Sequence, residues 1–269
     1  MRLYEYGLPG GAKLTGYLRE PAEHMPDYAV RPGVLIMPGG GYSHVGEREG
    51  DPVAMNFLNA GYQVFILRYT TTETAPAPLR FAPLLDAARA MQHLRQNAAA
   101  LYLDPKRLAV CGFSAGGHLA AATAMLAEHP EVCEALGTDG KQLVPDAVVL
   151  GYSVITAGPF AHRGSIENLA GDDRALQELF SLENQVRPDL PPFFIWHTVA
   201  DDLVPVQNSL LLADALGKCG VPYELHLFAN GVHGSSTCTR EVNQPNPHNA
   251  SWLPLCIDWL ADVFDYHLN

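Results

Sequence analysis

The sequence predicts an α/β fold: a mainly parallel, doubly wound sheet of about eight strands, helices on both faces and a small inserted cap at about residues 152–190. Short, fully apolar runs bounded by turn residues are typical of strands buried on both faces. These runs alternate with segments whose apolar residues repeat at helical spacing, an order that places helices on both sides of a parallel sheet. We expect residues 1–269 to form one domain, since no repeat or linker interrupts them.

The composition limits the classes of function. The chain has 269 residues, 48% of them hydrophobic, which is enough for a substantial core. Its formal net charge of −12, with no Lys/Arg cluster, argues against nucleic acid or an anionic membrane as a partner. The five cysteines are scattered and include no C-x-x-C pair, so we expect reduced core residues and neither disulfides nor a zinc site. We predict no metal and no cofactor.

The N-terminal segment is polar and lacks the apolar stretch of a signal peptide. No apolar run approaches the roughly 20 residues that a membrane-spanning helix needs. We therefore expect a cytoplasmic protein. The sequence leaves homo-oligomer formation open.

The elements of the first half can be predicted in order. Residues 2–6 and 14–19 alternate around a Gly-Gly turn, which favours an antiparallel hairpin. Asp51-Pro52 is typical of an N-cap followed by proline at the first helical position. The further elements expected here are strands at 33–37 and 62–69 and helices from 51 to near 61 and from 80 to 99.

The second half continues the alternation. The expected elements are strands at 108–111, 147–151, 192–197 and 221–228, and helices at 119–126, 206–218 and 252–267. His129, Glu131 and Glu134 are interpreted as part of a solvated loop and not as metal ligands.

The apolar run 108–111 leads into Gly112-Phe113-Ser114-Ala115-Gly116, and an alanine-rich helix follows. A G-x-S-x-G motif between a strand and a helix is typical of a nucleophile elbow. Glycines flank the serine because the turn is too tight for side chains there. The sequence therefore predicts Ser114 as a catalytic nucleophile at a helix N-terminus, where the helix dipole favours developing negative charge.

A serine hydroxyl becomes a good nucleophile only when a positioned base takes its proton and a third group holds that base. Reactive groups gather at the carboxyl ends of parallel strands. Asp201 and Asp202 follow the strand at 192–197, and His233 follows the strand at 221–228. We expect one of the two acids to accept from the imidazole and the other to cap the next helix, with Asp201 favoured for the first role.

Other histidines compete with His233 for the role of base. Only His233 lies in a glycine-flanked loop directly after a strand, and the order Ser, Asp, His is the one expected when the serine sits in a G-x-S-x-G elbow. The rivals are His118, interpreted as a packed residue one turn after Ser114, and His197, His226 and His248.

A catalytic triad also needs hydrogen-bond donors for the oxyanion, and the loop Pro38-Gly39-Gly40-Gly41-Tyr42 can supply them. Backbone N–H groups preset to receive an oxyanion contribute about 3–4 kcal/mol each. The candidates for this oxyanion hole are the N–H groups of Gly40, Gly41 and Ala115, the residue after the nucleophile. A phosphate-binding role is disfavoured, since neither G-x-G-x-x-G nor a Walker lysine is present. We expect Tyr42 and Tyr152 to line the substrate pocket.

Across most of its length the chain resembles α/β-hydrolases of the esterase/lipase type, in particular the bacterial acetyl esterase or acetyl-xylan-esterase-like group. The segments that carry the resemblance are PGGGYSHVGEREGDPVA, GFSAGGHLAA, PPFFIWHTVADDLVPVQNSLLLADAL and ELHLFANGVHG. It implies that Ser114 is the nucleophile, His233 the general base and then acid, and Asp201 the orienting carboxylate. Pro38 stands where many members carry histidine.

The resemblance also implies hydrolysis of short acyl esters and carbohydrate deacetylation. We therefore expect a serine carboxylic ester hydrolase that acts through an acyl-enzyme on short-chain, acetyl-type esters, with a small-molecule ester such as an acetylated oligosaccharide as its partner. Two alternatives stay open. One is an amidase or peptidase with the same triad, and the other is a non-catalytic binding protein on a hydrolase fold.

Overall fold

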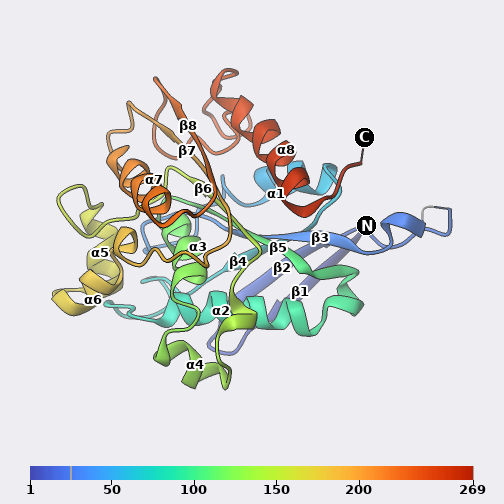
Figure 1. Cartoon of the computed structure of the whole chain (residues 1–269), viewed down its shortest axis with the longest axis horizontal. Coiled ribbons are helices and arrows are strands. Elements are labelled where there is room, and N and C mark those ends of the chain that lie inside the picture. Colours follow the sequence, from blue (N-terminus) through green and yellow to red (C-terminus); the bar gives the residue numbers. More distant parts are fainter. Residues whose placement is uncertain (25, 269) are drawn as a thin grey trace.

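The computed structural model describes residues 1–24 and 26–268, and eight strands within them form one sheet (Figure 1). The strand order is β1-β2-β4-β3-β5-β6-β7-β8. β1 and β2 pair antiparallel, as do β2 and β4, and every pair from β4 to β8 is parallel. The predicted mainly parallel sheet is confirmed. The strand bounds are β1 Arg2–Gly7, β2 Lys13–Leu18, β3 Arg31–Met37, β4 Gln63–Arg68, β5 Leu103–Phe113, β6 Ala147–Gly151, β7 Phe193–Thr198 and β8 Tyr223–Phe228.

Helices cover both faces of the sheet (Figure 1). One face carries α1, Asp51–Asn59, and α8, Trp252–Phe264; the other carries α2, Ala82–Gln96, α3, Ala115–Met125, and α7, Gln207–Cys219. The shorter helices are α4 Pro130–Leu136, α5 Arg163–Ala170 and α6 Arg174–Leu179, and 3-10 turns lie at Pro26–Tyr28, Ala98–Leu101, Lys141–Leu143, Leu182–Asn184 and Asn249–Ser251. The segment between β6 and β7, here called the insertion (residues 152–192), contains α5 and α6.

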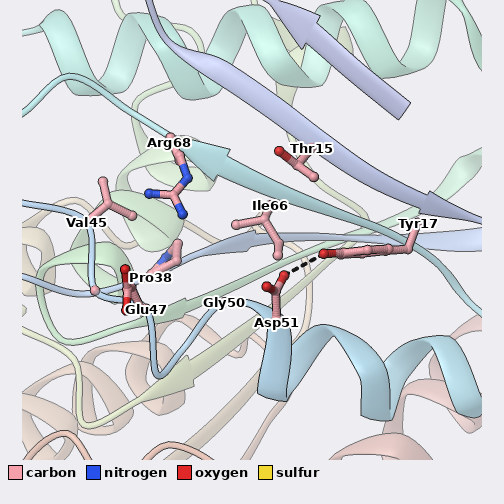
Figure 2. A pocket seen from close by; sticks show the side chains of 10 residues that line it. Thr15, Tyr17, Pro38, Val45, Glu47, Gly50, Asp51, Ile66 and Arg68 are labelled. Carbon is pink, nitrogen blue, oxygen red and sulfur yellow. Dashed lines mark hydrogen bonds between the residues drawn. The ribbon is translucent and has the colours of Figure 1, made fainter. Parts of the chain in front are cut away.

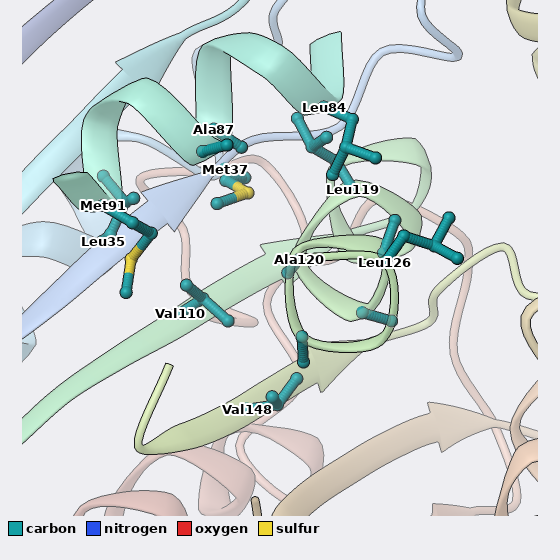
Figure 3. Close-up of a cluster of buried hydrophobic side chains, with 14 of the residues drawn as sticks. Leu35, Met37, Leu84, Ala87, Met91, Val110, Leu119, Ala120, Leu126 and Val148 are labelled. Carbon is teal, nitrogen blue, oxygen red and sulfur yellow. The ribbon is translucent and has the colours of Figure 1, made fainter. Parts of the chain in front are cut away.

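The larger core lies between the sheet and the helices α2, α3 and α7 (Figure 3). Each large apolar side chain buried here contributes about 1.5–3 kcal/mol relative to its exposed state. The labelled members in Figure 3 come from the strands β3, β5 and β6 and from α2, α3 and the turn that follows α3: Leu35, Met37, Val110, Val148, Leu84, Ala87, Met91, Leu119, Ala120 and Leu126. This packing fixes α3 against the strands whose ends carry the candidate site.

Local details differ from the sequence predictions. The segment from Pro130 is a helix, α4, and not a loop; His129 is its N-cap and accepts a hydrogen bond from the Glu131 N–H. Gly50 is the N-cap of α1, so Asp51 is already its first helical residue. Within the described ranges, none of the helices has the length and apolar character that crossing a lipid bilayer requires.

Candidate active site

Ser114 lies in a strained turn between β5 and α3. Its φ of 54° and ψ of −123° are a conformation that residues with a side chain rarely adopt. Hydrogen bonds hold the turn: the Ser114 N–H donates to the Gly151 carbonyl at 3.0 Å, and the Ser114 carbonyl accepts from Val154 at 3.1 Å. The side chain therefore stands at the carboxyl edge of the sheet, at the first turn of α3.

The glycines on either side of Ser114 are dictated by close packing. A Cβ atom on Gly112 would overlap the Gly116 carbonyl, and one on Gly116 would overlap the Met37 carbonyl at the end of β3. The two glycines of the G-x-S-x-G pattern are therefore required because α3 packs closely against β3 and β5.

The structure brings Ser114 and His233 together across 119 positions of sequence. His233 Nε2 lies 2.8 Å from Ser114 Oγ, and its Nδ1 lies 2.7 Å from Asp201 Oδ2. Because the carboxylate can only accept, Nδ1 carries the proton and Nε2 is free to accept from the serine hydroxyl. This chain of hydrogen bonds has the geometry that general-base activation of a serine requires.

Asp201 is held by four donors. Its Oδ1 accepts from the N–H groups of Leu203 and Val204, and its Oδ2 accepts from His233 and, at 3.3 Å, from His197. Burial by itself would raise the pKa of Asp201. The hydrogen bonds from His197 and His233, the charge of His233 and the Val204 N–H outweigh burial and hold the pKa well below its usual range. Asp201 is therefore a permanent anion beside His233.

Asp202, the neighbouring acid, is exposed, and it does not cap the next helix. The N-cap of α7 is Val206, without a side-chain cap bond. The expectation that Asp202 caps this helix is wrong, because Asp201 itself closes the turn through the N–H groups of Leu203 and Val204.

His197 is a second imidazole on Asp201 and is fully buried. Its Nε2 lies 3.0 Å from the Val204 carbonyl, which can only accept, so Nε2 carries a proton, which it shares between this carbonyl and Asp201 Oδ2 at 3.3 Å. Its Nδ1 then accepts from the Ser209 hydroxyl at 2.8 Å. His197 therefore contacts the same oxygen of Asp201, Oδ2, as His233 does.

The glycine loop passes directly beside Ser114. A Cβ on Gly39 would lie 2.9 Å from Ser114 Cβ, and Gly40 and Gly41 have φ of +130° and +64°. A Cβ on Gly40 would overlap the His44 carbonyl, so this path is open to glycine only. Both Gly40 and Gly41 line the same cavity as Ser114 and His233.

The cavity over Ser114 has a volume of about 900 Å³ and charged walls. Five charged side chains from the segment after the glycine loop and from its surroundings line it: Glu47, Arg48, Glu49, Arg68 and Glu73. From the insertion, His162 lines the cavity, and its Nδ1 lies 2.7 Å from Ser165 Oγ. Burial lowers the pKa of His162, the nearby His233 lowers it further, and Asp201 partly offsets both. His162 is thus a neutral imidazole near neutral pH.

A second hollow of about 390 Å³ adjoins this cavity and shares part of its wall (Figure 2). Val45, Glu47 and Arg68 line both spaces. At its far side the Tyr17 hydroxyl donates to Asp51 Oδ1 at 2.6 Å. Charged side chains therefore form part of the wall of both spaces.

Tyr42 and Tyr152 were expected to line the substrate pocket, but both are only 1% exposed and neither lines the cavity over Ser114. The Tyr42 hydroxyl, at the end of the glycine loop, lies 2.8 Å from His118 Nδ1. The Tyr152 hydroxyl donates to Glu49, and its ring packs edge-on against the His233 ring. Because their hydroxyl groups bond to buried side chains, these tyrosines pack behind the site residues and do not face the cavity.

Two residues of the site, Glu49 and His162, and the contact of His197 with Asp201 were missed by the sequence analysis. His197 offered a signal, since it lies four residues before Asp201 at the end of a strand. Glu49 and His162 lie in irregular segments where no periodicity indicates which side chain points inward. Among the described residues, no group of three or more His, Cys, Asp or Glu side chains is arranged to hold a metal ion.

The fold and this arrangement define a class. The eight-stranded, mostly parallel sheet with Ser114 in a strand–turn–helix, an acid after β7 and a histidine after β8 is that of an α/β-hydrolase of the esterase-like group. More particularly, the chain belongs to the BD-FAE family, whose model matches residues 23–216.

Known relatives agree with this assignment. The chain is 39% identical over 222 residues to endo-1,4-beta-xylanase B of Butyrivibrio fibrisolvens, covering 80% of this chain and 34% of that protein. It is 28% identical over 209 residues to an acetylxylan esterase of Xylanibacter ruminicola, covering 75% and 40%. The chain thus spans between a third and two fifths of the length of these two relatives.

Solved structures match over nearly the whole chain. An acetyl ester-xyloside bifunctional hydrolase from Caldicellulosiruptor lactoaceticus has a TM-score of 0.81 at 34% identity, covering 96% of this chain and 90% of that one. The carboxylesterase Cest-2923 from Lactobacillus plantarum has a TM-score of 0.85 at 26% identity, covering 97% and 98%.

Proposed function

We propose that the protein is a serine carboxylic ester hydrolase that acts through an acyl-enzyme on short-chain, acetyl-type esters of saccharides. The observation that carries the proposal is the hydrogen-bonded line from Ser114 Oγ through His233 to Asp201, with distances of 2.8 and 2.7 Å. The similarity to an acetylxylan esterase and to an acetyl ester-xyloside bifunctional hydrolase supports the substrate class.

The chemistry follows from the positions of these groups. Ser114 Oγ attacks the ester carbonyl while His233 Nε2 takes its proton, and Asp201 stabilises the resulting imidazolium. The N–H groups of Gly40, Gly41 and Ala115 receive the oxyanion. His233 then gives its proton to the alkoxy oxygen as the C–O bond breaks. Water repeats the sequence on the acyl-enzyme and releases the acid and free Ser114.

The shape of the site supports a polar leaving group. The cavity has charged side chains in its wall and shares Val45 and Arg68 with the hollow of Figure 2. Such a surface suits the hydroxyl groups of a sugar better than a long acyl chain, because apolar groups gain little from charged walls.

The variant Ser114→Ala tests this proposal. Loss of the nucleophile removes the whole covalent route, so turnover of p-nitrophenyl acetate should fall by about six decades. The wild-type protein should release acetate from acetylated xylo-oligosaccharides and lose activity from acetate to octanoate esters. Near wild-type hydrolysis by Ser114→Ala, or a preference for octanoate, would overturn the mechanism or the acetyl assignment respectively.

A further inference from the structure

A buried carboxylate joins the two loops that meet at Ser114. Glu49 follows the glycine loop, forms part of the cavity wall and is only 6% exposed. Its Oε2 accepts from the Gly39 N–H at 3.0 Å, and its Oε1 accepts from the Tyr152 hydroxyl at 2.8 Å. Both of its oxygens are thus engaged by groups of the protein.

The direction of these hydrogen bonds is fixed. The Ser236 N–H donates to the Tyr152 hydroxyl at 3.0 Å, and a backbone N–H can only donate, so the tyrosine directs its own proton to Glu49. Burial raises the pKa of Tyr152 and the adjacent Glu49 raises it further, which keeps this hydroxyl protonated. Glu49 therefore faces two donors, which a carboxylate can accept together and an amide cannot.

The partners of Glu49 touch both halves of the candidate machinery. Gly39 lies against Ser114 and leads into the oxyanion-hole candidates. Tyr152 packs on the His233 ring with centroids 4.9 Å apart and an interplanar angle of 70°. Ser236, three residues after His233, also donates its hydroxyl to the Arg48 carbonyl at 2.6 Å. One side chain thus ties the glycine loop to the loop that carries the imidazole.

We propose that Glu49 is a positioning residue, which holds the glycine loop and the Tyr152–His233 pair so that the oxyanion donors and the base act on the same carbonyl. The inference rests on the proposed function. Misplacement by about 1 Å can cost about 100-fold in rate. If the carboxylate only stabilised the fold, its loss would lower thermal stability without lowering kcat of the folded protein.

Glu49→Gln is the direct test. Glutamine has the same shape but one acceptor oxygen, so its amide group meets either the Gly39 N–H or the Tyr152 hydroxyl, both donors. We expect kcat for p-nitrophenyl acetate to fall about 10- to 100-fold while KM stays within about twofold. Thermal unfolding is measured in parallel.

Asp86→Asn is the matched control. Asp86 is 1% exposed and also accepts with both oxygens: Oδ2 from the N–H and the hydroxyl of Thr70, and Oδ1 from Arg89 at 3.4 Å, but it does not contact the triad. This variant should lose thermal stability and keep its kcat. A similar loss of stability with a much lower kcat in Glu49→Gln separates positioning from folding.

Tyr152→Phe keeps the ring against His233 and removes only the hydroxyl. It should lower kcat as well. The double variant with Glu49→Gln should lose less than the product of the two single effects, because both changes break the same hydrogen-bond network. The control is Tyr62→Phe, a buried tyrosine that packs on Phe57 and Tyr266 instead. Its kcat should be unchanged.

The outcomes are distinguishable. If the wild-type protein hydrolyses no ester, the proposed function fails. If it does hydrolyse esters, a folded Glu49→Gln with kcat within twofold of wild type, or an effect confined to KM, overturns the positioning role. Where Glu49→Gln does not fold, Tyr152→Phe decides, and an unchanged kcat in that variant overturns it.

Discussion

At the scale of single residues, Asp201 concentrates four hydrogen bonds on one buried side chain. Two imidazoles, His197 and His233, share its Oδ2, while two backbone N–H groups occupy its Oδ1. The backbone contacts fix the position of the carboxylate, and His197 fixes its rotation. The Asp201 carboxylate is therefore held in one orientation, with Oδ2 directed at His233 Nδ1.

Asp201→Asn tests this arrangement. An amide keeps the shape but lacks the charge that stabilises the imidazolium, and it favours the wrong tautomer of His233. We expect kcat/KM for p-nitrophenyl acetate to fall about 10⁴-fold at neutral pH. Asp202→Asn is the control and should stay within twofold, since Asp202 is exposed. Equal losses in both variants would contradict the assignment of Asp201.

The triad candidates were accessible to sequence reasoning, and Glu49 was not. Ser114, Asp201 and His233 each follow an apolar strand, and parallel strands bring their carboxyl ends to one edge. Glu47 and Glu49 lie in one loop before α1, and only the folded path of that loop determines that Glu49 turns inward. Tyr42 and Tyr152 were placed wrongly because their exposure depends on tertiary packing.

At the scale of elements, the turn between β5 and α3 depends on backbone proximity. Gly116 packs against the end of β3 and leaves no space for a methyl group. The strands and longer helices were predictable because apolar runs and helical periodicity persist over many residues. The helix α4 was missed because its seven residues are too few to show a clear helical repeat, although Pro130 is a typical first helical residue.

Gly116→Ala should damage both stability and activity. The added Cβ overlaps the Met37 carbonyl, so β3 or α3 must move, at a cost of about 3 kcal/mol in the free energy of unfolding. The shift also displaces Ser114, so labelling by a fluorophosphonate should slow. Gly7→Ala is the control: among the described atoms nothing lies within 4 Å of its added Cβ. A stable, fully reactive Gly116→Ala would contradict this account.

At the scale of the whole molecule, His118 links three distant parts of the chain. It lies on α3, its Nε2 donates to the Phe180 carbonyl of the insertion at 2.9 Å, and its Nδ1 accepts from Tyr42 after the glycine loop. Burial lowers the pKa of His118 to about 4, partly offset by the bond to Phe180. The folded protein therefore keeps this imidazole neutral where an unfolded chain would protonate it.

This difference makes stability depend on pH in a defined window. Below pH 6.5 the unfolded chain binds a proton at His118 that the folded chain refuses, so stability falls as the pH is lowered from about 6.5 to about 4. The loss amounts to about 3 kcal/mol. Urea unfolding at several pH values in this range should show a shallower fall for His118→Gln, which keeps one donor and one acceptor. Parallel curves for the two proteins would exclude His118 as the cause.

The pairing of β3 with β5 carries a further consequence. Met37 lies opposite Gly112 in this parallel ladder, so the loop after β3 and the serine after β5 emerge from neighbouring strands. Their separation is set by main-chain hydrogen bonds, which every residue type except proline can make. Many substitutions of strand residues can therefore leave the distance between the ends of β3 and β5 unchanged. Changes in the outer loops can then alter substrate specificity while this distance is kept.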